Sequence, residues 1–273
     1  MMEHKVFGII TIPSLGLGTW RMGGVTSPEV NQKEECIQAI RTAIGLGIRH
    51  IDTAEYYADG FTETIVGEAI QPYNRKDLFI TTKVWQTHLT YDQTLKACNT
   101  SLKRLGIDYI DLYLIHRPGP DMDLAGTMHA LEELQTNGRV RAIGVSNFSL
   151  EQIQEAQRYL RTTRITAVQN EYNLFTRDDA LLMYCVKNDI AFVAYRPIIK
   201  LATHSPPFLD VLMEKYNKTK VQIVLNWLTA KKNIVTIPKA VQPQHLHDIA
   251  GSLGWKMSLE DYNLLDNYRV GGS

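Results

Sequence analysis

The sequence lacks any apolar run close to the roughly 18 residues that a membrane-spanning helix needs. Its start, MMEHKVFGII, also lacks the charged beginning and apolar core of a signal peptide. No stretch rich in glycine, proline or serine is long enough to link two domains. These absences predict an unexported protein with one domain over residues 1–273, and they argue against a membrane partner.

Cysteine is scarce, and charge of one sign is not in excess. Cys36, Cys98 and Cys185 are an odd number of distant thiols within helical patterns, so we expect them to be reduced and buried. A cytoplasmic location is the simplest explanation of such thiols. The 29 basic residues balance the 29 acidic residues, and no block of like charge occurs. This balance argues against a nucleic-acid partner.

What the sequence does contain is an alternation of short β-rich apolar runs with amphipathic segments of helical period. The runs that predict strands are Leu15–Thr19, Arg49–Thr53, Leu78–Val84, Tyr109–His116, Val140–Val145, Ala167–Gln169, Ala191–Tyr195 and Ile234–Pro238. Strands separated by helices require a parallel sheet covered on both faces, and eight such units close into a barrel of about 250 residues. We therefore predict an α/β fold, a (β/α)8 TIM barrel, with a hairpin at Lys5–Ile12 that caps the barrel floor.

An open, doubly wound sheet is the alternative architecture. Such sheets usually carry G-x-G-x-x-G after the first strand, and here the third glycine is missing after Gly16 and Gly18. The barrel is therefore favoured, and in a barrel the chemistry belongs at the carboxyl ends of the strands.

Ionisable residues gather at the predicted carboxyl ends of three neighbouring strands. Asp52 closes the second strand and Tyr57 follows in the loop, while Lys83 closes the third strand and His116 the fourth. Because side chains alternate between the two faces of a strand, these groups can all point at one mouth. An unpaired ammonium inside a barrel is too costly to keep charged, and Asp52 is the obvious partner for Lys83.

Two interpretations of these four residues remain open from the residues alone. Asp52 and Lys83 are either only a structural ion pair, with His116 a core histidine and Tyr57 a loop aromatic, or a catalytic group. A cation beside a tyrosine favours the phenolate and lowers the tyrosine pKa from about 10 toward neutrality. Such tuning is what acid–base catalysis requires, so the four together favour the catalytic interpretation.

Eight short motifs lie at the ends of the predicted strands. They are Gly16–Trp20, Asp52–Tyr57, Thr82–Trp85, His116–Pro118, Gly144–Phe148, Gln169–Tyr172, Ala194–Pro197 and Ile237–Lys239. In content and order they resemble the aldo-keto reductase superfamily, from about Leu15 to Asp266. The resemblance implies an NAD(P)H-dependent oxidoreductase that reduces small aldehydes or ketones to alcohols by hydride transfer.

The resemblance places a catalytic tetrad on the four residues that the strand pattern selects. Tyr57 is then the general acid, Lys83 lowers its pKa and is held by Asp52, and His116 orients and polarises the carbonyl. The implied substrate-binding residues are Trp20, Tyr57, Trp85 and His116. The loop Arg117–Asp123 is short, which predicts a shallow mouth suited to small aldehydes or short sugars.

The resemblance also assigns residues to a nicotinamide cofactor. Ser146, Asn147 and Gln169 are implied to bind the carboxamide, and Tyr195 to stack on the ring. The other implied cofactor residues are Gly18, Thr19, Trp20, Asp52, Arg196, Pro197, Ile198, Lys239, Ala240, His245 and Asp248. Without the family, Ser146-Asn147 indicates an N-cap for a helix at Leu150–Leu160, and Tyr195 is a rim aromatic.

The last motif departs from the family pattern at the positions where relatives bind the 2′-phosphate of NADP. Relatives usually have Ser or Thr after the lysine and an arginine six residues beyond it, but this chain has Ala240 and His245. Lys239 is kept and Arg196 adds positive charge. NADP(H) is therefore the preferred cofactor, with NAD(H) as the alternative.

Other functions are compatible with parts of the sequence. One is a non-catalytic regulatory subunit that kept the barrel and its cofactor, and another is a Schiff-base aldolase built on Lys83. A carboxylate partner pushes the lysine pKa the wrong way for a Schiff base. His204, His245 and His247 are not predicted to bind a metal, because residues two apart on a helix do not share a face. We expect a monomer or a weak homo-oligomer.

Overall fold

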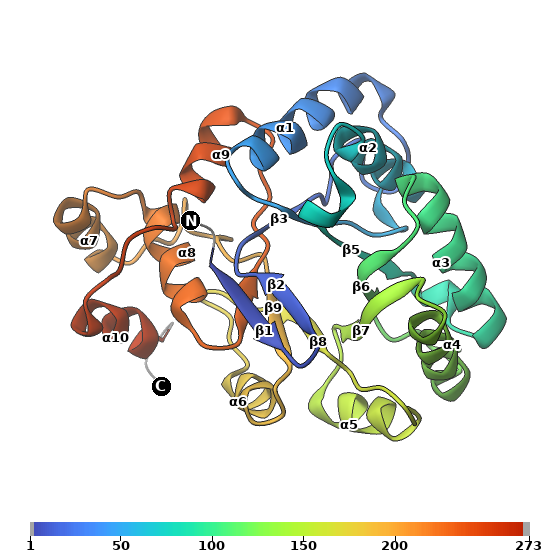
Figure 1. The fold of residues 1–273 in the computed structure, drawn as a ribbon. Helices are drawn as coiled ribbons and strands as arrows, with labels where there is room; N and C mark the ends of the chain where they lie inside the picture. Colours follow the sequence, from blue (N-terminus) through green and yellow to red (C-terminus); the bar gives the residue numbers. More distant parts are fainter. Residues whose placement is uncertain (1–2, 270–273) are drawn as a thin grey trace.

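The computed structural model describes residues 3–269, and within them eight parallel strands form one sheet (Figure 1). The strands are β3 (Gly16–Gly18), β4 (His50–Asp52), β5 (Phe79–Val84), β6 (Ile110–Ile115), β7 (Val140–Ser146), β8 (Ala167–Glu171), β9 (Ala191–Tyr195) and β10 (Ile234–Thr236). They neighbour one another in chain order, and a parallel bridge between Leu15 and Thr236 joins the two ends of the sheet. The predicted (β/α)8 barrel is confirmed.

Helices cover the outside of the strand ring (Figure 1). They are α1 (Lys33–Gly45), α2 (Phe61–Ile70), α3 (Tyr91–Leu105), α4 (Leu124–Thr136), α5 (Leu150–Arg158), α6 (Asp179–Lys187), α7 (Phe208–Tyr216), α8 (Lys220–Ala230), α9 (Pro243–Ala250) and α10 (Leu259–Asn267). Across residues 3–269, no helix is both long and apolar enough to cross a membrane.

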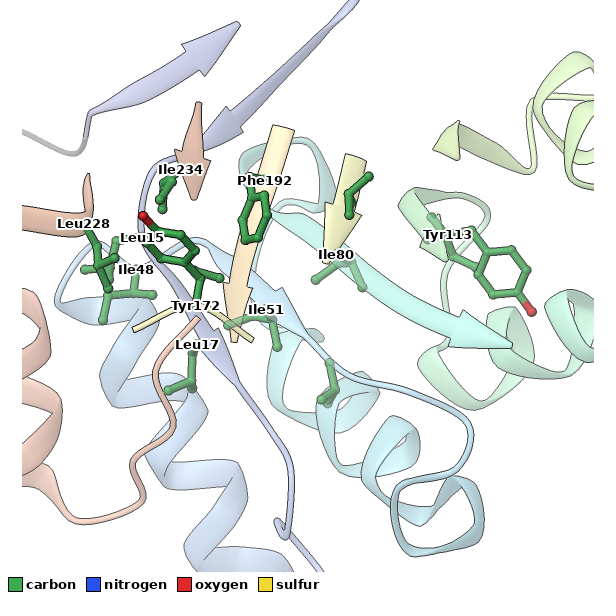
Figure 2. Close-up of a cluster of buried hydrophobic side chains, with 14 of the residues drawn as sticks. Leu15, Leu17, Ile48, Ile51, Ile80, Tyr113, Tyr172, Phe192, Leu228 and Ile234 are labelled. Carbon is green, nitrogen blue, oxygen red and sulfur yellow. The ribbon is translucent and has the colours of Figure 1, made fainter. Parts of the chain in front are cut away.

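Alternation along each strand divides its side chains between two apolar clusters. Phe79, Leu112 and Leu114 belong to the cluster inside the barrel. Ile80 and Tyr113 belong to the larger cluster between the sheet and the helices (Figure 2). Strands covered on both faces are apolar on both, which is why they appear in the sequence as continuous apolar runs. The polar residues at their carboxyl ends are exceptions to this pattern.

The predicted hairpin is present as β1 (His4–Phe7) and β2 (Ile10–Pro13), two antiparallel strands. Its side chains Phe7, Ile10 and Ile12 join the cluster inside the barrel, so the hairpin packs on the barrel floor. The ammonium of Lys5 donates to the carbonyl oxygens of Thr229 and Ile234, both at 2.7 Å. These bonds fasten the hairpin to the end of α8 and the start of β10.

The last predicted strand is shorter in the structure than in the sequence analysis. β10 ends at Thr236, two residues before the expected end at Pro238. Proline has no N–H to give to a neighbouring strand. The carbonyl oxygen of Pro238 instead accepts a hydrogen bond of 2.9 Å from the N–H of Gly18, which brings this segment against the end of β3.

Candidate active site

The structure brings together Asp52, Lys83, Tyr57 and His116 at the carboxyl ends of β4, β5 and β6. The ammonium of Lys83 donates to Asp52 Oδ1 at 2.5 Å, to the carbonyl oxygen of Thr53 at 2.8 Å and to the hydroxyl of Tyr57 at 3.4 Å. The rings of Tyr57 and His116 meet edge to face, with centroids 5.5 Å apart. Asp52, Lys83 and Tyr57 are all buried. A chain of polar contacts therefore runs from the barrel interior to its mouth.

Two further side chains hold Asp52 in place. Gln169, on β8, donates from its amide to Asp52 Oδ2 at 2.7 Å, so both carboxylate oxygens of Asp52 have a partner. Thr19 donates from its N–H and from its hydroxyl to the carbonyl oxygen of Asp52, both at 2.9 Å. These contacts tie the ends of β3 and β8 to the end of β4.

The protonation of Lys83 and Tyr57 depends on burial as well as on neighbouring charged groups. Burial alone would lower the pKa of Lys83, but Asp52 and Tyr57 together raise it above its ordinary value. Burial raises the pKa of Tyr57, and this effect outweighs the lowering by Lys83. The sequence-based expectation that Lys83 brings the Tyr57 pKa toward neutrality is therefore wrong for this geometry. Tyr57 carries its proton at neutral pH.

His116 is a neutral imidazole at the same mouth. Burial lowers the pKa of His116 well below its usual range, and the positive charges of Lys83 and Arg117 lower it further. Its Nδ1 atom is buried and has no hydrogen-bond partner within residues 3–269. A neutral imidazole can donate one hydrogen bond and accept another, so it can position an incoming polar group.

Three flat rings form one wall of the mouth, and the central one was not assigned a role in the sequence analysis. Tyr56 stacks on Trp85 with centroids 3.8 Å apart and an angle of 16° between the rings. On its other side Tyr56 is nearly parallel to Trp20, with centroids 6.1 Å apart. Trp20 also packs on Tyr57 at 4.9 Å. Tyr56 lies in a loop, where strand alternation predicts no orientation.

A buried carboxylate positions this wall. Glu55 accepts a hydrogen bond from the N–H of Trp85 and lies 3.0 Å from Nδ1 of His88. Glu55 itself is only 7% exposed. The segment from Asp52 to Tyr57 therefore supplies buried carboxylates, the central ring of the wall and the phenol from six consecutive residues.

The residues expected to face the nicotinamide lie together at the ends of β7, β8 and β9. The side-chain amide of Asn147 donates to the carbonyl oxygen of His116 at 2.9 Å and to the hydroxyl oxygen of Ser146 at 3.0 Å. Tyr195 donates from its hydroxyl to Asn147 Oδ1 at 2.7 Å. Asn147 has a φ of 60°, a left-handed conformation that asparagine tolerates better than most residues. Gln169 lies beside this group on β8.

Ser146 and Asn147 are not a helix cap, which was the alternative interpretation. The N-cap of α5 is Ser149, whose hydroxyl accepts a hydrogen bond from the N–H of Gln152 while the Gln152 side chain bonds back. Because this reciprocal capping box starts three residues after Ser146, the two earlier residues are free for another role.

Four further predicted cofactor residues lie after β10 and in α9. Lys239 and His245 are exposed, Asp248 is half-buried and Ala240 is buried. Lys239 forms no hydrogen bond or ion pair within residues 3–269. Burial raises the pKa of the Cys36 thiol in α1, and the positive charge of Lys239 opposes this rise. His245 lies in the first turn of α9, which is next to α1 in Figure 1.

The three predicted cofactor residues in the turn after β9 differ in their exposure to solvent. Pro197 is buried and Ile198 is half-buried. Arg196 is paired with Glu171 at 3.3 Å, so a carboxylate already balances the positive charge that the sequence analysis counted toward a phosphate. Gly18, at the end of β3, has no room for a side chain, since a Cβ there would lie 2.9 Å from the carbonyl oxygen of Ile237.

Comparisons with known proteins show the family of this chain. The family model for the aldo/keto reductase family matches residues 14–202. A glyoxal reductase from Bacillus subtilis is 34% identical over 266 residues, covering 96% of this chain and 91% of the relative. The crystal structure of the thermostable aldo-keto reductase Tm1743 with the inhibitor epalrestat superposes with a TM-score of 0.91 at 42% identity, covering 97% of this chain and 99% of the other. An aldo-keto reductase from Klebsiella pneumoniae in complex with NADPH gives a TM-score of 0.87 at 32% identity, with coverage of 97% and 94%.

Proposed function

Because this chain belongs to the aldo/keto reductase family, we propose that it reduces small aldehydes or ketones to alcohols with NADPH as the hydride donor. The observation that carries the proposal is the buried chain of Asp52, Lys83 and Tyr57, which reaches the mouth beside a neutral His116. The similarity to a glyoxal reductase supports α-oxoaldehydes as a substrate class.

In the proposed mechanism, Tyr57 donates its phenolic proton to the carbonyl oxygen of the substrate. The raised pKa of Tyr57 keeps that proton in place at neutral pH, and the ammonium of Lys83 at 3.4 Å stabilises the phenolate that forms. Asp52 holds the ammonium, and His116 orients the carbonyl by a hydrogen bond from its neutral ring. When bound, the reduced nicotinamide supplies the hydride that reaches the carbonyl carbon.

The side chains fit a nicotinamide dinucleotide. Ser146, Gln169 and Asn147 would hold the carboxamide and Tyr195 would cover the ring. At the other end, Lys239 is an exposed ammonium without a hydrogen bond or ion pair within residues 3–269, which suits a phosphate. The similarity to an NADPH complex supports NADP(H) over NAD(H).

A spectrophotometric assay tests the proposed function directly. Oxidation of NADPH and NADH is followed with glyoxal, methylglyoxal, a short aldose and an aromatic ketone. We expect glyoxal and methylglyoxal to be reduced, with NADPH preferred. Tight NADPH binding without oxidation against any carbonyl would instead support the non-catalytic regulatory subunit. The intact chain of Asp52, Lys83 and Tyr57 is the reason for ranking that alternative second.

An aldolase built on Lys83 ranks last. A Schiff-base lysine must lose its proton near neutral pH, and the raised pKa of Lys83 opposes this.

The three thiols bear on the cellular location of the protein. Cys36, Cys98 and Cys185 are buried and form no disulfide, which supports a cytoplasmic location.

Changing His245 to arginine is expected to increase the preference for NADPH. A histidine ring offers at most one hydrogen bond to a phosphate, whereas a guanidinium offers a charged pair, so the ratio of the NADH to the NADPH dissociation constant should rise about tenfold. Titration of both cofactors by tryptophan fluorescence measures this ratio. His247→Arg is the matched control, because His247 is exposed on the same helix and bonds to Pro243. Equal effects of the two variants would place His245 away from the phosphate.

Removing the ring of Tyr56 is expected to broaden the range of substrates. Tyr56→Ala deletes the central member of the wall between Trp20 and Trp85, which leaves space for bulky carbonyls. We expect kcat/KM for an aromatic ketone, relative to glyoxal, to rise about tenfold, while Tyr56→Phe leaves this ratio unchanged. An unchanged ratio in the alanine variant would mean that the wall does not limit substrate size.

A further inference from the structure

A second cavity opens at the end of the barrel opposite the proposed active site. Its volume is about 680 Å³, and it lies between the hairpin and the amino-terminal ends of β4 to β7. Ile10 from the hairpin and Phe79 from β5 line it, together with the charged residues Arg49, Lys76 and Arg141. None of these residues belongs to the mouth that holds Tyr57 and His116.

Hydrogen bonds fasten the hairpin through residues that do not line the cavity. Lys5 bonds to carbonyl oxygens at the end of α8 and the start of β10, and the N–H of Gly8 donates to Asp189 just before β9 at 3.0 Å. Asp189 is in turn paired with Arg164 at 3.0 Å. These bonds hold the hairpin toward β8 to β10 (Figure 1). The cavity lies beside it, at the amino-terminal ends of β4 to β7.

Two of the three cations in the cavity wall, Arg49 and Lys76, have no ion-pair partner within residues 3–269. Arg49 and Lys76 are exposed and form no side-chain hydrogen bond or ion pair within residues 3–269. Arg141 is 52% exposed and lies 3.3 Å from Asp111, a carboxylate that Arg75 already holds at 2.5 Å. Asp77 is the other carboxylate in the wall. Phe79 and Ile10 are buried at the base of the cavity, which gives it an apolar floor.

We propose that this floor cavity binds a small polyanion whose two or more carboxylate or phosphate groups are held by Arg49 and Lys76. Two cations in one cavity wall suit a ligand with two anionic groups better than one with a single charge. The open cavity admits a compact molecule, and the apolar base accommodates its carbon or bridging part. The site is independent of carbonyl reduction, because it lies at the other end of the barrel.

Isothermal titration of inorganic pyrophosphate and of citrate into the NADPH-saturated protein tests this site. Saturation with NADPH blocks phosphate entry at Lys239, so binding at the floor is measured alone. We expect saturable binding that weakens about tenfold in Arg49→Ala/Lys76→Ala and falls with added salt. Asp77→Asn should tighten binding, because it removes a negative charge from the wall. The better of the two ligands identifies phosphate or carboxylate as the preferred group.

Several outcomes would overturn the proposal. Absence of binding of both anions at millimolar concentration is one. Binding that Lys239→Ala abolishes and the floor variants leave unchanged would assign the anion to the cofactor region. Binding of an acidic peptide without binding of either small anion would show a protein-docking surface instead. Because the titration needs no turnover, a protein that fails to reduce any carbonyl still gives a result.

Discussion

Tyr57→Phe is expected to lower kcat for carbonyl reduction by about a thousandfold while leaving NADPH affinity unchanged. The substitution removes one hydroxyl, which accepts a hydrogen bond from the ammonium of Lys83 at 3.4 Å, and keeps the ring that packs on Trp20 and His116. The proton donor is lost while the shape of the mouth is retained. Steady-state rates with glyoxal and fluorescence titration of NADPH measure the two quantities separately.

The pH dependence of reduction provides a second measurement of the same group. Reduction needs the protonated phenol, and burial raises the pKa of Tyr57 above its ordinary value near 10. The rate should therefore persist through neutral pH and decline only in the alkaline range, where the phenol ionises. A decline centred near pH 7 would contradict this assignment.

Tyr113→Phe is the matched control for the loss of a buried phenolic hydroxyl. Tyr113 lies on β6 in the cluster between the sheet and the helices, and its hydroxyl has no hydrogen-bond partner within residues 3–269 (Figure 2). Its replacement should change neither turnover nor NADPH affinity. Comparable activity in the two phenylalanine variants would remove Tyr57 from the role of general acid.

Lys83→Met is expected to abolish reduction and to destabilise the fold. The variant leaves Asp52 in the barrel interior with only the amide of Gln169, because the ion pair of 2.5 Å is lost. Breaking a buried pair by removing one partner costs about 3 kcal/mol or more. The free energy of unfolding from urea titration, together with kcat, measures both effects.

The double variant Asp52→Asn/Lys83→Met distinguishes stability from chemistry. It removes both charges, so we expect the free energy of unfolding to recover by about 2 kcal/mol relative to Lys83→Met. Activity should remain absent, because no ammonium is left to stabilise the phenolate of Tyr57. Unchanged stability and activity in the single lysine variant would show that the pair is peripheral to both.

The sequence by itself determined the barrel, the hairpin and the four residues that meet at its mouth. Alternation and helical period are local properties, so Lys83 and His116 can be placed on the inner face of their strands from a few neighbours each. The content and order of the eight motifs are also readable from the sequence alone, and they indicate the family. Treating residues 1–273 as one domain stays a prediction, as do the roles of the individual site residues.

Only the tertiary structure decided how these groups influence one another. The pKa of Tyr57 depends on burial by every surrounding element, which a sequence pattern does not report, and it rises although a cation is near. Tyr56 stacks with two tryptophans that are distant in the sequence, and together the three rings form the wall. Arg196 forms an ion pair with Glu171. The floor cavity lies between the hairpin and the amino-terminal ends of four strands. Each of these depends on contacts between segments far apart in the chain, whereas local periodicity specifies only the face of a strand or helix on which a residue lies.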